Sequence, residues 1–192
     1  AASGALGNVY LLANRRTEAL TLTHQAILAA QRAGAAELLF RWHWQAARLH
    51  RARRDLDQAI GSYRLALAAY EASNLSPVHA DFNLFASEPS HAVFLEHADL
   101  LLQKSGTLGN SAGAQGYLVE ARDAVEMLKA RELQDYFRDS CVAEARTRVK
   151  ALVQNIGPGT AVLYPIVLPD RLELLLNLGP EIKRFTVVVK ES

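Results

Sequence analysis

Apolar residues at the start of the chain recur at helical spacing and then give way to residues that end helices. The pattern predicts one helix that stops at Asn14, because asparagine tolerates the left-handed backbone conformation found at helix ends. Thr17 can cap a second helix, which carries Ala19 and Leu20 on its apolar face and ends at Gly34. The sequence therefore predicts two helices joined by a short turn.

The same pattern returns 40 residues further on, where the pair Ala19-Leu20 reappears as Ala59-Ile60. This second block predicts a helix from about Ala36 to Ala52 and then a second helix, which Asp55 can cap. Small residues in both helices let the two approach each other closely; they are Ala46, Ala47, Ala59 and Ala66. A helical repeat is the simplest interpretation of the two blocks.

A third, degenerate helix pair is predicted beyond Ser90. Its first helix is expected to end at Gly106, and its second helix to begin near Gln115 and to pass Phe137. Between them, Thr107–Ala114 is rich in Gly and Ser, which predicts a mobile surface insertion. The run Asn155–Gly159 then marks a boundary, so we expect one domain over residues 1–154 and the start of another over 155–192.

The last stretch changes to the two-residue period of β-strands, with strands predicted over residues 161–168, 171–178 and 183–189. The first strand is apolar on both faces, as in a strand buried from two sides, and Pro165 predicts an edge or a bulge there. The other two strands each gather apolar residues on one face: Leu172, Leu174, Leu176 and Leu178, and Phe185, Val187 and Val189. These strands need a covering helix, the preceding helices or another copy of the chain to bury that surface.

The helical blocks resemble the tetratricopeptide repeat, a helix–turn–helix unit of about 34 residues. The resemblance rests on Leu6-Gly7-x-x-Tyr10 with Ala19 and Ala26, and on Ala46-Ala47-x-x-His50 with Ala59, Tyr63 and Ala66. The chain departs from the family pattern where an early Trp is usual, at Ser3 and His43, and at Thr23, where an aromatic is usual. The predicted fold is therefore mainly α: a tetratricopeptide-like α-solenoid followed by a β-meander of about three strands.

Three later segments together resemble the junction of bacterial repeat proteins that carry a CHAT domain, a caspase- and separase-like peptidase module. The segments are Leu128–Cys141, Ala161–Leu168 and Pro169–Leu176. The resemblance implies a cysteine peptidase with a His–Cys dyad, controlled by its repeats. The family's catalytic segments come later than these strands and match no residue here, so we expect this chain to be a non-catalytic, truncated piece of such a protein.

Composition narrows the classes of partner. The formal net charge of +1 argues against a nucleic-acid or membrane partner, and no apolar run is long enough to span a bilayer. One cysteine, Cys141, allows no internal disulfide, so a reducing, cytoplasmic setting is expected, with the thiol in a structural role. The chain has no glycine-rich nucleotide-binding motif, and we expect no cofactor.

Histidines offer only incomplete metal sites. Glu88-x-x-His91 has the spacing of half a carboxylate-bridged site, but no second pair accompanies it. His43 and His50 share one helix face, and two histidines alone do not complete a zinc site. No metal is expected, and His50 is interpreted as filling the aromatic packing position of its repeat.

Arginine supplies the strongest candidate for recognition. Arg15 and Arg16 lie in the first turn, and further arginines follow from residue 41 to residue 54, where Arg53 and Arg54 are expected to be solvated. Arg forms bidentate pairs with carboxylates, so a surface for an acidic peptide is one interpretation and a solvated face is the other. The residues expected to face the concave side of the array are Asn8, Arg41, Trp44, Arg48 and Arg51.

The repeats and the strands together favour two functions. The first is a protein–protein interaction module that regulates a CHAT-type peptidase. The alternative is a stand-alone adaptor that binds a peptide or partner protein, with no peptidase in the parent. In either case, the C-terminal strands are expected to fold back on the helices or to pair between chains as a homodimer.

Overall fold

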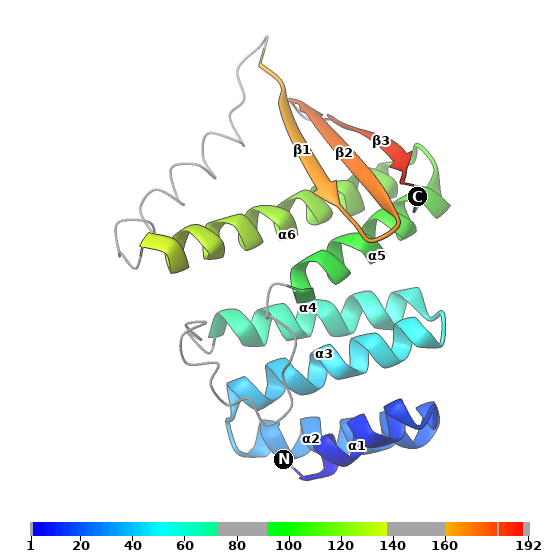
Figure 1. Cartoon of the computed structure of the whole chain (residues 1–192), viewed down its shortest axis with the longest axis vertical. Helices are drawn as coiled ribbons and strands as arrows, with labels where there is room; N and C mark the ends of the chain where they lie inside the picture. The colour runs from blue at the N-terminus through cyan, green and yellow to red at the C-terminus, as the bar shows by residue number, and fades with distance from the viewer. Residues whose placement is uncertain (1, 73–91, 138–159, 180, 190–192) are drawn as a thin grey trace. The chain divides into compact units, whose positions relative to one another are not determined.

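The computed structural model describes residues 2–72, 92–137, 160–179 and 181–189. Six helices packed in sequential pairs are followed by a three-stranded antiparallel sheet, which confirms the predicted mainly α architecture with a C-terminal meander (Figure 1). The helices are α1 (Ala2–Leu12), α2 (Arg16–Arg32), α3 (Ala36–Ala52), α4 (Leu56–Ala72), α5 (Ala92–Leu108) and α6 (Ala112–Phe137). The strands are β1 (Val162–Val167), β2 (Arg171–Leu178) and β3 (Glu181–Val188).

The chain forms two compact units, Ala1–Val93 and Phe94–Ser192, called unit 1 and unit 2 below. Unit 1 contains α1 to α4, and unit 2 contains nearly all of α5 together with α6 and the sheet. The predicted domain boundary between residues 154 and 155 lies outside the described residues, as do Glu88, His91 and Cys141.

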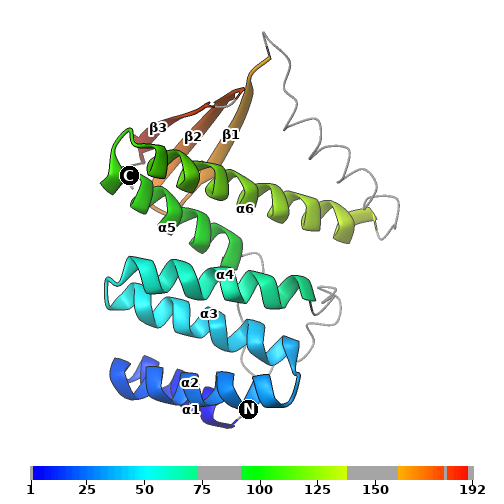
Figure 2. The same ribbon diagram turned by 180° about the vertical axis from the view of Figure 1, so that it is seen from behind.

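The 40-residue step in unit 1 comes from long helices rather than from long linkers. Helices α2, α3 and α4 have 17 residues each. Short turns at residues 13–15, 33–35 and 53–55 join α1 to α2, α2 to α3 and α3 to α4, so consecutive helices pack against each other (Figure 2). One helix and one turn repeat every 20 residues, and two such steps give the period seen in the sequence.

The three turns of unit 1 share one geometry. Asn14, Gly34 and Arg54 occupy equivalent places and have φ values of 59°, 61° and 61°. In each turn the residue after the left-handed one donates its N–H to a carbonyl five residues earlier, as Arg15 does to Tyr10 at 2.8 Å, which is the Schellman pattern. The prediction that Asn14 ends a helix in the left-handed conformation is confirmed.

The start of α2 differs from the sequence prediction. Its N-cap is Arg15, with no capping hydrogen bond from a side chain, and Thr17 already lies inside the helix. The prediction that Thr17 caps this helix is therefore wrong. Asp55 behaves as predicted, because its Oδ1 accepts a hydrogen bond from the N–H of Gln58 at 3.3 Å at the start of α4.

Small residues build the helix contacts of unit 1. A Cβ added to Gly4 of α1 would lie 2.6 Å from three ring atoms of Trp42 in α3, so the indole rests directly on the α1 backbone. Nearby, the Gln45 amide donates to Thr23 Oγ1 at 2.7 Å, which ties α3 to α2. The small residues predicted at the helix crossings, Ala46, Ala47, Ala59 and Ala66, are at most 2% exposed. Ala19 and Ala26 of α2 are buried to the same degree.

The helices of unit 2 meet in a turn rather than an insertion. Helix α5 continues through Gly106 to Leu108, and Gly109, with φ of 60°, follows its last residue. Helix α6 starts at Ala112, where Ser111 Oγ accepts the N–H of Ala114 at 3.2 Å. The predicted mobile insertion over Thr107–Ala114, with Gly106 as the helix end, is therefore wrong, because Gly109 provides the turn and Ser111 the cap.

The sheet is a meander in the order β1-β2-β3, with both pairs antiparallel. β1 is an edge strand, as Pro165 predicts. Its burial alternates: Tyr164, Ile166 and Leu168 are buried, whereas Leu163 is 54% and Val167 is 74% exposed. The prediction that β1 is buried from two sides is therefore wrong, because α5 and α6, the helices described in unit 2, cover one face of the sheet and leave Leu163 and Val167 exposed.

No helix in the described residues combines the length and apolar character needed to cross a membrane.

Candidate functional site

The predicted recognition residues fall mainly on one stripe of α3. Arg41, Trp44, Arg48 and Arg51 follow one another at steps of three or four residues, which places them along one side of the helix. Arg51 is exposed, and the other three are half-buried. We call these four residues the α3 stripe.

An aromatic–cation stack forms the centre of the α3 stripe. The Arg48 guanidinium carbon lies 4.4 Å from the centroid of the Trp44 ring, within the range of a cation–π contact. Trp44 in turn stacks on Phe40, with ring centroids 5.6 Å apart and an interplanar angle of 30°. Since Phe40 is almost fully buried and also packs on Tyr70 of α4, the stack connects the surface to the core of the helix pair.

The remaining predicted site residues are less closely joined. Arg41 approaches the ring of Trp42, with 6.0 Å between guanidinium carbon and centroid. Asn8 lies half-buried on α1, and within the described residues no hydrogen bond, ion pair or ring contact joins it to the α3 stripe. The structure therefore brings Trp44 and Arg48 together and gives Asn8 no direct part in that contact.

The arginines of the first turn have structural partners. Arg15 lies over the Tyr10 ring at 4.4 Å and pairs with Glu18 at 2.9 Å. Arg16 Nη1 donates to the carbonyl of Ala52 at 2.6 Å, which satisfies an acceptor at the C-terminal end of α3. These contacts separate Arg15 and Arg16 from the recognition residues of α3.

Three histidines meet where α2 packs on α3. The rings of His24 and His50 have centroids 6.3 Å apart, and His50 is 9% exposed, which agrees with a packing role. Burial lowers the pKa of His43 and of His50 below the ordinary value of 6.5, and the nearby His24 imidazole lowers both further. Within the part of the chain that the structure describes, no group of three or more His, Cys, Asp or Glu is placed to hold a metal ion.

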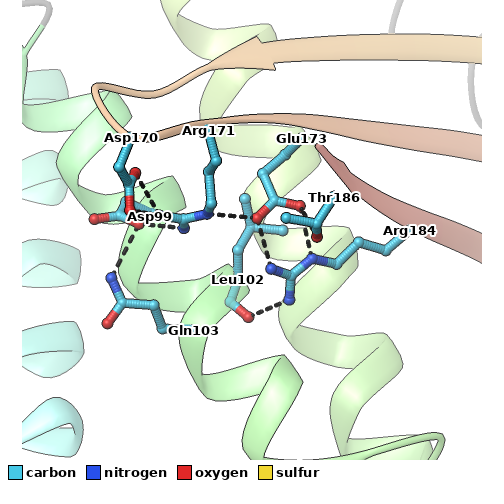
Figure 3. A network of polar contacts seen from close by, with 8 residues as sticks. All are labelled: Asp99, Leu102, Gln103, Asp170, Arg171, Glu173, Arg184 and Thr186. Atoms are coloured by element: carbon cyan, nitrogen blue, oxygen red, sulfur yellow. Dashed lines mark hydrogen bonds and ion pairs between the residues drawn. The ribbon is translucent and has the colours of Figure 1, made fainter. Parts of the chain in front are cut away.

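A buried ionic network connects α5 to the sheet in unit 2 (Figure 3). Glu173 of β2 is fully buried and accepts hydrogen bonds from Arg171, Arg184 and the Thr186 hydroxyl at 2.6 to 2.9 Å. Arg171 also pairs with Asp99 of α5. Arg184 donates to the carbonyl of Leu102, again on α5, at 2.6 Å.

The network holds its charges in place by mutual pairing. Burial acts to raise the pKa of Glu173, but hydrogen bonds from Arg184, Arg171 and Thr186 bring that pKa below its ordinary value. Burial likewise acts to lower the pKa of Arg171, but Glu173 and Asp99 raise it above its ordinary value. The arrangement keeps Glu173 and Arg171 ionised and fixes the sheet on α5, so its role is structural positioning rather than acid–base chemistry.

Sequence reasoning missed this network, although one signal was present. Glu173 stands between leucines, and together with Leu175 and Asn177 it occupies the buried face of β2. The face formed by Leu172, Leu174 and Leu176 is only half-buried. A charged residue in the middle of a leucine-rich strand therefore marked the face that packs on helices, where a partner charge was required.

Comparisons of the chain with protein-family models, with curated proteins and with solved structures found no match.

Proposed function

We propose that the chain is a protein-recognition module that binds an acidic segment of a partner through the α3 stripe. The observation that carries the proposal is the Arg48–Trp44–Phe40 stack, which holds a guanidinium at the surface on a rigid aromatic support. A guanidinium pre-positioned in this way loses less side-chain entropy on pairing with a carboxylate than one on a freely rotating chain.

The residues around the stack support the same chemistry. Arg41 and Arg51 extend the positive charge along the helix on both sides of Arg48. Arg and Trp are also the residue types enriched among those that dominate protein interfaces. An acidic peptide lying along α3 is the ligand class that this combination of planar donors and aromatic surface favours.

The wider role remains the one that the resemblance implies. As part of the proposal, the module regulates a CHAT-type peptidase in its parent protein, and the stand-alone adaptor is the alternative. Recognition by the α3 stripe serves either role, so the binding experiment tests the shared step.

The test is a titration with a short synthetic peptide of Glu and Asp, followed by tryptophan fluorescence. The chain has two tryptophans, Trp42 and Trp44, and Trp44 lies in the proposed site. The double variant Arg48→Ala/Arg51→Ala is expected to weaken binding about tenfold or more, since hydrogen bonds to charged groups contribute about 1.5–3 kcal/mol. Its melting temperature is expected to stay close to that of the parent chain.

A charge-matched control separates this site from general electrostatics. Arg32→Ala/Arg53→Ala removes the same charge from the exposed ends of α2 and α3. This control is expected to bind nearly as well as the parent. Equal weakening in both double variants would show attraction by net charge alone, and unchanged binding in the α3 variant would exclude the α3 stripe.

A further inference from the structure

The two edges of the sheet differ in what their backbones offer. Leu168 donates its N–H to the carbonyl of Arg171 at 2.9 Å, and Val189 donates to Asp170 at 3.3 Å. Because ladder partners alternate along a strand, these two bonds fix which residues of β1 and β3 bond to β2 and which face away from it. The positions whose backbone N–H and carbonyl groups point away from β2 are called outward-facing here. They are Leu163, Pro165 and Val167 on β1, and Ile182, Arg184, Thr186 and Val188 on β3.

The β1 edge is blocked at its centre. Pro165 has no N–H and occupies the middle one of the three outward-facing positions of β1. Proline at such a position is a common protection against pairing with another chain.

One end of the β3 edge is also occupied, by a side chain that imitates a neighbouring strand. Gln115 of α6 accepts the N–H of Ile182 at 3.1 Å and donates to its carbonyl at 3.0 Å. The amide thus satisfies both outward groups of Ile182 in the way that a paired strand would. This contact independently confirms that the backbone N–H and carbonyl groups of the even-numbered β3 residues point away from β2.

The rest of the β3 edge is open among the described residues. Within the part of the chain that the structure describes, the outward N–H and carbonyl groups of Arg184, Thr186 and Val188 have no backbone partner. The side chains around them are exposed as well, with Val187 at 51%, Val188 at 71% and Val189 at 57%. A strand edge that carries exposed valines, is free of proline and is unpaired is a template for another strand.

We propose that this open edge pairs with the same edge of a second copy of the chain, antiparallel and about a two-fold axis at Thr186. In this register Thr186 pairs with its own copy, and Arg184 pairs with Val188 in both directions. All three open outward-facing positions then exchange hydrogen bonds. Registers centred on Phe185 or Val187 lose one of these pairs, because Gln115 already holds Ile182 or because the strand runs out.

The side chains agree with the same register. Phe185, which is 52% exposed, lies opposite Val187 of the other copy, and an aromatic residue opposite a β-branched one is a favourable cross-strand pair. Lys183 lies opposite Val189, and Arg184 opposite Val188, so no like charges face each other. The two-fold axis brings the same edge of both copies together, so the pairing is isologous and closed. The half-exposed leucine face of β2 would then continue across a six-stranded sheet.

The expected association is weak, because a contact along one strand edge falls below the roughly 1,000 Å² typical of stable interfaces. Sedimentation equilibrium of the whole chain is expected to show a monomer at about 10 µM and a rising dimer fraction toward about 1 mM. Val188→Pro is expected to lower the association constant at least tenfold, because it removes an outward donor. Val188→Thr keeps that donor and is expected to associate as the parent does.

Amide exchange by NMR provides a second readout that does not depend on the variant. Protection at Arg184, Thr186 and Val188 is expected to rise with concentration, whereas Phe185 and Val187 stay protected at every concentration. A monomer throughout the range would overturn the proposal, as would a dimer that Val188→Pro leaves intact. Concentration-independent protection of the outward amides would also overturn it, since another part of the chain would then cover the edge.

Discussion

The interiors of unit 1 and unit 2 are stabilised by different kinds of contact. Among the described residues, the buried polar side chains of unit 1 are the uncharged Thr23 and the imidazole of His50, packed among alanines and aromatic rings. Unit 2 buries two carboxylates, Asp99 and Glu173, and pairs them with arginines from its strands. One chain therefore uses close apolar packing for helix on helix and an ionic network for sheet on helix.

The difference shows what each arrangement requires of the sequence. Helices with small residues at their crossings can approach closely and gain dispersion contacts along their whole length. The sheet of unit 2 contacts α5 through β2 and β3, and the network joins these elements by specific pairs of charged and polar groups. Burying charges in this way does little for net stability, but removing one partner leaves the others uncompensated.

The largest expected effect is loss of the Glu173 carboxylate. Glu173→Ala removes the fully buried carboxylate that the largely buried Arg171 and Arg184 guanidiniums share, so it is expected to cost about 3–5 kcal/mol. Urea unfolding followed by hydrogen exchange of the β2 and β3 peptides measures this loss. Glu181→Ala, at an exposed position of β3, is the matched control and is expected to change little.

If Glu173→Ala were as mild as Glu181→Ala, the contrast between the units would fail. The network would then contribute no more to stability than an exposed ion pair, and the apolar contacts of α6 with the sheet would stabilise unit 2. Both tryptophans belong to unit 1, so fluorescence during the same titration reports whether the change stays within unit 2.

A smaller effect is expected from a methyl group at the closest helix contact of unit 1. Gly4→Ala places Cβ against the Trp42 indole at a distance that real structures avoid, so the indole or one of the helices must shift. Overpacking of this kind costs about 1–3 kcal/mol. The shift in the unfolding midpoint, read by tryptophan fluorescence, measures the cost.

Gly61→Ala in α4 is the control for that substitution. A Cβ at Gly61 meets no atom within 4 Å, so helix propensity alone acts, and a stabilisation of up to about 1 kcal/mol is expected. Opposite signs at the two glycines would confirm that close packing rather than helix propensity decides at Gly4. The same sign at both would contradict it.

Acid is expected to weaken unit 1 before unit 2. His43 and His50 have lowered pKa values in the folded chain, so the unfolded chain binds protons more readily, and stability is lost as the pH falls below 6.5. Glu173 also has a lowered pKa, but its contribution is present above 4.5 and is lost only below that value. Unfolding midpoints measured by fluorescence and by hydrogen exchange between about pH 7.5 and 3.5 separate the two units.

His50→Phe tests the origin of the first acid step. Phenylalanine keeps an aromatic ring at this buried position and cannot be protonated, so the loss of unit 1 stability between about pH 6.5 and 5 is expected to become shallower. An unchanged pH profile would mean that His50 does not contribute to the acid sensitivity of unit 1.

Local rules predicted unit 1 better than unit 2. Helical spacing, Asn14 and Gly34 as helix ends, and alanines at the crossings depend on neighbours within a few residues, and the structure confirms them. Thr17 failed because the Schellman turn places Arg15 at the cap, a choice that depends on turn geometry. The 20-residue step was not recognised in the sequence, because three different residue types, Asn, Gly and Arg, occupy the left-handed position of the three turns.

Unit 2 depends on contacts between distant residues, which the pattern of a single strand does not contain. The strands and the edge position of β1 were predicted, but the network that holds Glu173 also needs the pair of Arg171 with Asp99, which are 72 residues apart in the chain. Likewise, nothing near Gln115 indicates that its amide would pair with Ile182. Of the predicted site residues, Trp44 and Arg48 could be grouped by helical spacing, whereas their stacking on Phe40 required the structure.

The smallest expected effect concerns the turns that give unit 1 its regular step. Arg54 holds the left-handed conformation with φ of 61°, where its Cβ crowds the backbone at a cost of roughly 1–2 kcal/mol. Arg54→Gly removes that cost but gives the unfolded chain more freedom, which takes back about 0.4–1 kcal/mol. A net stabilisation of about 0.5–1 kcal/mol is expected, measured by urea unfolding with tryptophan fluorescence.

Gly34 provides the reverse test at the equivalent place in the preceding turn. Gly34→Ala forces a Cβ into the same backbone conformation, with no other atom within 4 Å, so only backbone strain acts, and a destabilisation of about 1 kcal/mol is expected. Effects of opposite sign would show that the turns of unit 1 are equivalent in energy as well as in geometry. If Arg54→Gly were destabilising, the arginine side chain would contribute to this turn, and the contrast between a neutral unit 1 and an ionic unit 2 would need revision at that position.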